Sequence, residues 1–231
     1  MVKLESVLCL IVVSSYLLNI FLKSNCPLCQ RPTSKEFCLD CTRQLQRCQL
    51  SNPSFFWQGQ LPVFAWGVYG GILKRAIAAL KYENQPQIAR PLGQLLAQAW
   101  LNSQLASTVI VVPIPLHADK QKQRGYNQAA LLAQSFCKIT GLHLQQMGLE
   151  RIRGTEAQFG LSVLEREKNL AMAFKLGSGF RRQVPAKPIL LLDDIYTTGA
   201  TARSAVQTLQ KLGIPVYGLV ASATSQKKMS D

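Results

Sequence analysis

Apolar residues in the second half of the chain follow two alternating patterns, short continuous runs and longer segments with helical spacing. The runs are rich in β-branched residues and end at prolines or polar residues, which is typical of strands buried on both faces. The segments between them repeat apolar residues every three or four positions and stop at glycines, as amphipathic helices do. We therefore expect strands in 108–115, 142–147, 187–194 and 214–224, and helices in 127–141 and 200–213.

Alternating strands and helices predict an α/β domain with a mostly parallel sheet. Before this domain, the aromatic stretch 51–70 contains several Pro and Gly residues and is interpreted as a linker with short strands. Two helices are expected after it, in 70–82 and 88–104. The predicted parts are an apolar N-terminal helix (1–23), a cysteine-rich module (24–50), a linker and helical hood region (51–105), the α/β domain (106–224) and a polar tail (225–231).

The N-terminal segment 7–22 is apolar apart from two serines and an asparagine. It is shorter than the roughly 20 apolar residues that a membrane span needs, and no small-residue cleavage site follows it. We expect an amphipathic or buried docking helix in a cytoplasmic protein. A membrane anchor or export signal is the alternative, so membrane association through this segment stays open.

The net charge of the chain indicates which kinds of partner it would bind. Lys and Arg number 26 against 12 Asp and Glu, a formal net charge of +14. Such an excess favours nucleic acid, phosphorylated metabolites or acidic lipid without choosing among them, and a basic surface with no dedicated partner is the alternative. With 48% hydrophobic and 16% charged residues, the composition excludes a disordered chain.

Four of the seven cysteines form two C-x-x-C pairs separated by eight residues. The odd total and the clustering argue against a disulfide framework. Each pair brings two thiolates within reach of one ion, and two pairs make a tetrahedral cage that suits zinc. Four protein ligands leave no open position, so we expect a structural site. A thiol–disulfide couple in each pair is the alternative, and Cys48 is an alternative ligand. The predicted ligands are Cys26, Cys29, Cys38 and Cys41.

Two adjacent carboxylates, Asp193 and Asp194, end the most apolar predicted strand. Buried carboxylates are costly without partners, and ligands of open parallel sheets bind beyond the carboxyl ends of the strands. Residues 197–201 then supply hydroxyls, a glycine and a helix start, which together can cradle a phosphate. Carboxylates accept hydrogen bonds from ribose hydroxyls. The stretch therefore predicts a site for a ribose 5-phosphate, with an ordinary capped strand–helix turn as the alternative.

The segment 190–201, LLLDDIYTTGAT, resembles the phosphoribosyl pyrophosphate (PRPP) binding motif of type I phosphoribosyltransferases. The resemblance implies that Asp193 and Asp194 contact the ribose hydroxyls and that Mg²⁺ accompanies PRPP. It also implies that hydroxyls and backbone N–H groups of the following loop hold the 5-phosphate. The implied PRPP-binding residues after the acidic pair are Ile195, Tyr196, Thr197, Thr198, Gly199, Ala200 and Thr201.

Further segments, together with the cysteine module, resemble the ComF (competence protein F) family. They are LKY (80–82), VPIPLH (112–117), RGYNQA (124–129) and QFGLSVLEREKN (158–169). The resemblance covers 24–222. It implies a type I phosphoribosyltransferase-like fold, a mostly parallel sheet flanked by helices, with a small N-terminal four-cysteine zinc ribbon. It further implies a phosphoribosyltransferase that uses Mg-PRPP, carries structural Zn²⁺ and has an unknown acceptor.

Transfer from PRPP builds positive charge on the ribose ring and negative charge on the leaving pyrophosphate. Catalysis then rests on positioning and electrostatics. We expect Arg124 and Arg166 to act with the acidic pair, and Lys81 is a third basic candidate. A solvated surface charge is the alternative for each arginine. His117 fits acid–base work and a structural role equally.

A second function from a different class fits the same chain. The basic charge, the zinc ribbon and the aromatic residues are compatible with single-stranded DNA, and the family name implies a link to natural transformation. The alternative is thus a non-catalytic DNA-handling protein that works with the competence machinery. A homo-oligomer is compatible with either function. We assign Trp57, Trp66 and Trp100 to the core rather than to base stacking.

Overall fold

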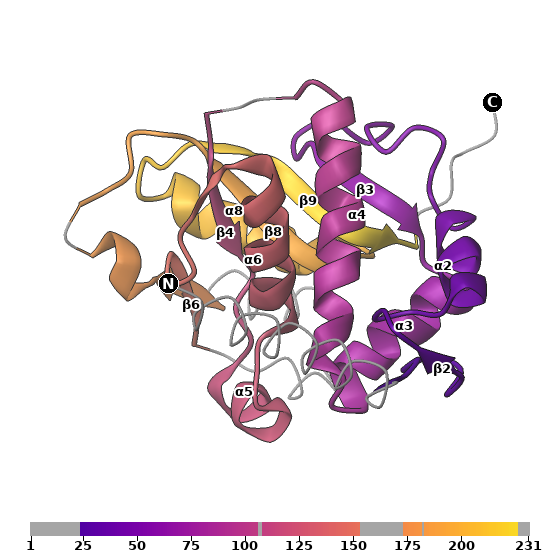
Figure 1. Ribbon diagram of the computed structural model, residues 1–231. Coiled ribbons are helices and arrows are strands. Elements are labelled where there is room, and N and C mark those ends of the chain that lie inside the picture. The colour runs from indigo at the N-terminus through magenta and orange to yellow at the C-terminus, as the bar shows by residue number, and fades with distance from the viewer. Residues whose placement is uncertain (1–23, 106–107, 153–172, 182, 226–231) are drawn as a thin grey trace, which may run out of the picture. The chain divides into compact units, whose positions relative to one another are not determined.

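The computed structural model describes residues 24–105, 108–152, 173–181 and 183–225. The chain divides into two compact units, with the boundary between Arg47 and Cys48. Figure 1 labels the helices and strands of both units. Within the described ranges, no helix has the length and apolar character needed to cross a membrane. The apolar N-terminal segment lies outside them.

The first unit combines a small hairpin with one helix. Strands β1 (Ser24–Asn25) and β2 (Pro32–Thr33) pair antiparallel, and α2 spans Leu39–Gln46. Its buried apolar residues are few, and besides two of the cysteines they are Leu28, Phe37 and Leu45. A core this small needs an additional cross-link or metal to be stable alone.

The second unit is built on a five-stranded sheet in the order β3-β9-β8-β4-β5. Every pairing in it is parallel, and the side chains of Ile189 to Leu192 in the central strand are fully buried. The predicted α/β fold with a parallel sheet is confirmed. The strands are β3 (Val63–Val68), β4 (Ile110–Pro113), β5 (His143–Leu144), β8 (Ile189–Tyr196) and β9 (Val216–Thr224).

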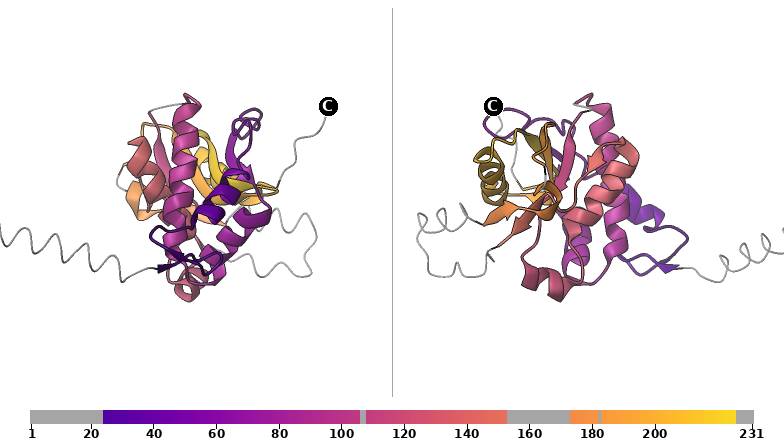
Figure 2. Two further views of the ribbon diagram at one scale, coloured as in Figure 1. Left: turned by 45° about the vertical axis from the view of Figure 1, so that its right-hand side comes forward. Right: turned by 90° about the vertical axis from the view of Figure 1, so that its left-hand side faces the viewer.

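Helices cover both faces of this sheet. Figure 2 shows α4 and α6 on one face and α8 on the other. A short antiparallel pair, β6 with β7, packs beside α8. The elements are α3 (Gly71–Tyr82), η1 (Pro86–Ile88), α4 (Ala89–Asn102), α5 (Ala118–Arg124), α6 (Gln128–Thr140), β6 (Leu149–Arg151), β7 (Phe174–Leu176), η3 (Ser178–Phe180) and α8 (Ala200–Gln210).

Helices α4 and α6 approach each other closely at Gly93. A Cβ atom at this position would lie 2.6 Å from the Cβ of Ser135 and 2.7 Å from the carbonyl oxygen of Leu132. Only glycine leaves room for this contact, which brings both helices down onto the same face of the sheet.

The stretch 51–70 supplies more than a linker with short strands. Its strand β3 pairs along its length with β9 and forms one edge of the main sheet. The assignment of the tryptophans to the core is confirmed, since Trp66 is buried and the Trp57 ring lies 5.6 Å from that of Trp100. The segment therefore belongs to the same packed unit as the predicted α/β domain.

Candidate functional site

The acidic pair lies on a part of β8 that extends beyond β4. The last paired residues of β4 and β8 are Pro113 and Leu192, whereas β8 continues to pair with β9 as far as Tyr196. Asp193 and Asp194 therefore lie within the strand, not at its last residue. The backbone N–H of Asp194 donates to the Asp193 carboxylate at 2.8 Å, which satisfies a strand donor past the end of β4.

A tight turn connects β8 to α8. Gly199 adopts the left-handed conformation (φ 76°) directly before the first helical residue, which favours glycine. A Cβ there would lie 2.8 Å from both the Tyr196 hydroxyl and the Arg203 Nη1. Arg203 Nη1 also donates to the Thr198 carbonyl at 2.7 Å. The turn is thus held closed against the helix start, where free N–H groups attract anions.

Lys81, in the last turn of α3, forms an ion pair with Asp194. Both side chains are well buried, with 18% of Lys81 and 5% of Asp194 exposed. Burial by itself lowers the pKa of the Lys81 ammonium, but the Asp194 carboxylate outweighs it, so the pKa is raised above its ordinary value. The resemblance at LKY thus corresponds to a lysine that reaches the acidic pair.

For the Asp193 carboxyl, burial and the neighbouring charge change the pKa in the same direction. Burial, followed by the charge of Asp194, raises the pKa of its carboxyl well above the ordinary value. Arg151 of β6 lies close enough to Asp193 to sense its charge. The Arg151 guanidinium also lies 5.4 Å from the centre of the Phe174 ring. Burial lowers the pKa of Arg151, and the charge of Asp193 acts in the opposite direction.

These groups surround a cavity of about 260 Å³, the inner cavity. The structure brings Arg124 together there with Asp193, Asp194, Ile195, Thr197 and Thr201. Tyr196, Thr198, Gly199 and Ala200 belong to the same strand, turn and helix start without lining the cavity. Arg166 lies outside the described residues. Other cations that line the cavity are Lys81, Lys120 and Arg151.

The RGYNQA segment positions Arg124 at this cavity. Gly125 ends α5 in the left-handed conformation (φ 82°), and the Tyr126 hydroxyl donates to the Leu80 carbonyl at the end of α3. Asn127 accepts from the Ala129 N–H and donates to the Ile114 carbonyl, both at 3.0 Å. These hydrogen bonds connect the end of α3, the residue after β4 and the start of α6. Tyr126 and Asn127 of this segment therefore have a structural role.

His117 has a structural position. Its Nδ1 accepts from the backbone N–H of Asp119 at 3.5 Å and caps the start of α5. It is not among the described residues that line the inner cavity. Of its two sequence interpretations, the geometry favours the structural one.

The first unit holds a candidate metal centre. The Sγ atoms of Cys26, Cys29, Cys38 and Cys41 all lie within 4.8 Å of one another. In the first pair, the backbone carbonyl oxygen of Cys26 accepts from the Gln30 N–H at 2.8 Å and so forms a tight turn. In the second pair, Cys38 is the residue directly before α2, without a side-chain capping hydrogen bond, and Cys41 lies in the first turn of the helix, where the helix dipole stabilises thiolates.

The four sulfurs fit zinc in number and type. Burial raises the pKa of Cys26, but backbone N–H groups of Cys38 and Leu28 outweigh it and lower that pKa to about 7. Burial and the neighbouring thiols raise the pKa of Cys41. The predicted four-cysteine cluster is confirmed as a group that can bind zinc, and Cys48 is not a member of it.

Comparisons with curated proteins find relatives along most of the chain. Competence protein F of Haemophilus influenzae is 32% identical over 209 residues, which cover 84% of this chain and 89% of that protein. DNA utilization protein YhgH of Salmonella typhimurium is 30% identical, over 82% of this chain and 79% of that protein. Competence protein ComFC of Bacillus subtilis is 26% identical, over 81% and 72%.

No protein-family model matches the chain. Solved structures with some likeness include adenine phosphoribosyltransferase of Leishmania donovani, with 14% identity, a TM-score of 0.37, and 78% of this chain and 66% of that chain covered. Another is hypoxanthine phosphoribosyltransferase of Staphylococcus aureus, with 15% identity, a TM-score of 0.34, and 63% and 71% covered.

Proposed function

This chain belongs to the competence protein F (ComF) family, and from that membership we propose that it is a phosphoribosyltransferase that binds Mg-PRPP in the inner cavity. One observation carries the proposal. Two adjacent carboxylates, Asp193 and Asp194, on the central parallel strand are followed at once by a hydroxyl-rich turn into α8, and both features border one cavity.

The two ends of ribose 5-phosphate match this arrangement. Ribose hydroxyls donate hydrogen bonds to the carboxylates, which accept but cannot donate when ionised. The 5-phosphate fits the turn 197–201, where threonine hydroxyls and the N-terminus of an 11-residue helix favour an anion. Gly199 allows the close approach that such a turn requires.

The cations of the cavity suit the other half of the substrate. In the reaction, the C1–O bond to pyrophosphate breaks, its electron pair leaves on pyrophosphate, and an acceptor nitrogen bonds to C1. Mg²⁺ supplies charge neutralisation for the pyrophosphate that carries it. Arg124 and Arg151 border the cavity and stabilise the negative charge on the leaving group. Lys81 pairs with Asp194, which reduces the repulsion that two adjacent carboxylates would exert on the pyrophosphate.

A second candidate function is the handling of single-stranded DNA, with the inner cavity as a ligand-binding module. The exposed ring of Tyr82 favours it, because 78% of this residue is exposed and a guanidinium, that of Arg124, lies 5.6 Å from its centre. Aromatic rings beside cations stack with bases of any sequence. Relatives named for competence and DNA utilization agree with this function.

Calorimetric titration with Mg-PRPP tests the first function. The wild type, zinc-loaded, should bind, and Asp193→Asn/Asp194→Asn should not. Glu83→Gln is the control, since this exposed carboxylate lies near the site without lining it, and binding should be unchanged. Absence of PRPP binding to the wild type would refute the proposal. Salt-dependent oligonucleotide binding that survives the double substitution would favour the second function instead.

A further inference from the structure

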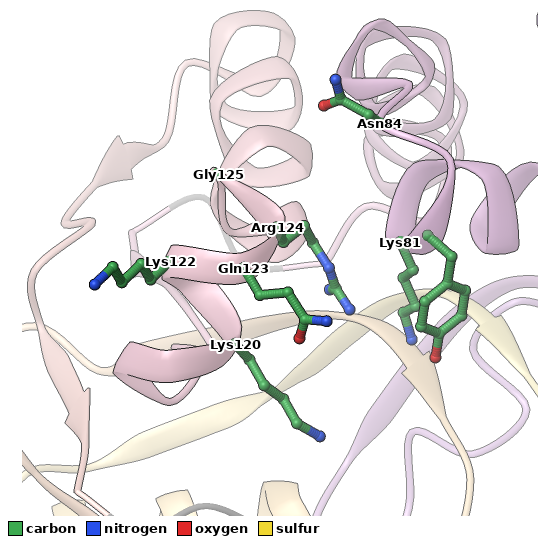
Figure 3. A pocket seen from close by; sticks show the side chains of 8 residues that line it. Lys81, Asn84, Lys120, Lys122, Gln123, Arg124 and Gly125 are labelled. Carbon is green, nitrogen blue, oxygen red and sulfur yellow. The ribbon is translucent and has the colours of Figure 1, made fainter.

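A second and larger cavity adjoins the inner one. It has a volume of about 790 Å³ and shares Lys81, Tyr82, Lys120 and Arg124 with the inner cavity. We call it the outer pocket. It lies between the end of α3 and helix α5 (Figure 3), and Asn84 and Gln123 also line it. A volume of this size is within the range of small-molecule sites, about 300–1,000 Å³.

The outer pocket is strongly positive. None of the described residues that line it is acidic. Figure 3 shows the side chains of Lys81, Lys120 and Arg124 directed into the space between the two helices, while Lys122 points away from it. Asp194 balances the charge of Lys81. The printed contacts of Arg124 are with uncharged groups, the Gln128 side chain and the Tyr82 ring. A ligand in this pocket would therefore face the guanidinium of Arg124, which favours an anionic group.

An aromatic residue, Tyr82, lines both cavities. Tyr82 is largely exposed, which is unusual for a side chain that would gain from burial. Arg124 lies over its ring and, through Nη1, donates to Gln128, so the guanidinium is held in place. The ring and the guanidinium are planar groups on which another planar ring can stack.

Two amide side chains complete the lining. Asn84 follows α3 with a left-handed backbone (φ 50°), a conformation that asparagine tolerates better than most residues. Gln123 of α5 points into the pocket in Figure 3. An amide both donates and accepts hydrogen bonds, which matches the mixed donor and acceptor edge of a heteroaromatic ring.

We propose that the outer pocket binds the phosphoribosyl acceptor, and that this acceptor is a planar heteroaromatic ring with an anionic substituent, a carboxylate or a phosphate. The inference rests on the proposed function of the inner cavity. A ring nitrogen donates its lone pair to C1 of the ribose while the C1–O bond breaks and its electron pair leaves on pyrophosphate. A proton on that nitrogen passes to water. Neutral bases lack the anionic group that Arg124 would bind.

Matched ligand pairs test the proposal. Orotate differs from uracil, and nicotinate from nicotinamide, mainly by a negative charge. Each ligand is titrated calorimetrically into the full zinc-loaded chain after saturation with ribose 5-phosphate. We expect the anionic member of at least one pair to bind at least tenfold more tightly. Pyridoxine 5′-phosphate against pyridoxine forms the phosphate arm, since each has a free ring nitrogen, and it distinguishes a phosphate substituent from a carboxylate.

Single substitutions locate the binding. Tyr82→Ala and Lys120→Met should each weaken the anionic ligand about tenfold. Lys74→Met is the matched control, because this exposed lysine lies on α3 outside the pocket, and affinity should not change. Circular dichroism of each variant verifies that the fold is retained.

Three outcomes would overturn the proposal. The first is that neutral bases bind as tightly as their anionic partners. The second is that pyrophosphate alone displaces orotate and that Tyr82→Ala binds orotate as tightly as the wild type does. That result would make the outer pocket a leaving-group site. The third is that no ligand of either kind binds to protein saturated with ribose 5-phosphate. If ribose 5-phosphate and PRPP fail to bind but orotate binds in a Tyr82-dependent manner, the proposed function fails and the acceptor role falls with it.

Discussion

The ammonium group of Lys81 forms an ion pair with the carboxylate of Asp194, and this pair joins the end of α3 to the central strand β8. Both groups are largely removed from water. The ion pair therefore fixes the position of one wall of the inner cavity and places a cation beside one member of the acidic pair.

Removal of the lysine should be strongly destabilising. Lys81→Met leaves the Asp194 carboxylate buried without its cation, which costs about 3 kcal/mol. Urea denaturation measures the change in the free energy of unfolding. Lys74→Met, on the same helix but exposed, should stay within about 0.5 kcal/mol of the wild type. The double variant Lys81→Met/Asp194→Asn should recover part of the loss, and an equal loss in single and double variants would contradict the coupling.

Asp193 should make stability depend on pH. Its pKa is raised in the folded state by burial and by Asp194, so the native state binds a proton that the unfolded state has released. The stabilisation is complete below the unfolded-state pKa and declines as pH rises through the native pKa. Asp193→Asn, which keeps the acceptor for the Asp194 N–H, should be more stable than the wild type near pH 8, with the difference shrinking toward pH 4. A difference independent of pH would contradict the raised pKa.

Zinc should bind at one ion per chain. Cys38→Ser removes a ligand at the start of α2, and we expect loss of bound zinc in metal analysis by mass spectrometry. Cys48→Ser should keep the metal, because Cys48 is outside the four-sulfur cluster. Chelation of the wild type should reproduce the Cys38→Ser spectrum in circular dichroism. Equal zinc content in both cysteine variants would refute the assignment.

A methyl group at Gly93 should destabilise the protein although alanine is the better helix former. Gly93→Ala gains about 1 kcal/mol of helix propensity, but its Cβ would overlap Ser135 and the Leu132 carbonyl, and overpacking costs about 1–3 kcal/mol. We expect a net loss in urea denaturation. Gln94→Ala, at the exposed neighbouring position, is the control and should be neutral or slightly stabilising.

The strands and helices of the second half were predictable because their patterns are local. The continuous apolar run before Asp193 and the glycine stops at Gly141 and Gly213 mark elements without reference to the rest of the chain. The edge strand β3 was less evident, because its identity depends on pairing with β9 at the other end of the chain. Helix α5 has no buried residue, so it has no apolar periodicity that could reveal it.

The candidate site was predictable in its loop but not in its surroundings. The acidic pair and the turn are continuous in sequence, so their chemistry could be interpreted directly. The approach of Lys81 to Asp194 and of Arg151 to Asp193 depends on how α3 and β6 pack against the sheet, and no local pattern encodes it. Tyr126 and Asn127 belong to a segment that resembles the ComF family, and only the structure gives them a role, through their hydrogen bonds to Leu80 and Ile114.

The extension of β8 past the end of β4 has a consequence for how this site tolerates sequence change. From Asp193 onward the strand has β9 on one side only among the described strands, and Asp193, Asp194 and Ile195 border the inner cavity. A strand edge without a neighbouring strand presents peptide N–H and C=O groups, which every amino acid supplies alike. Alanine scanning leaves this surface intact and would underestimate it, whereas replacing single amides by esters, or following amide hydrogen exchange with ligand bound, would reveal it.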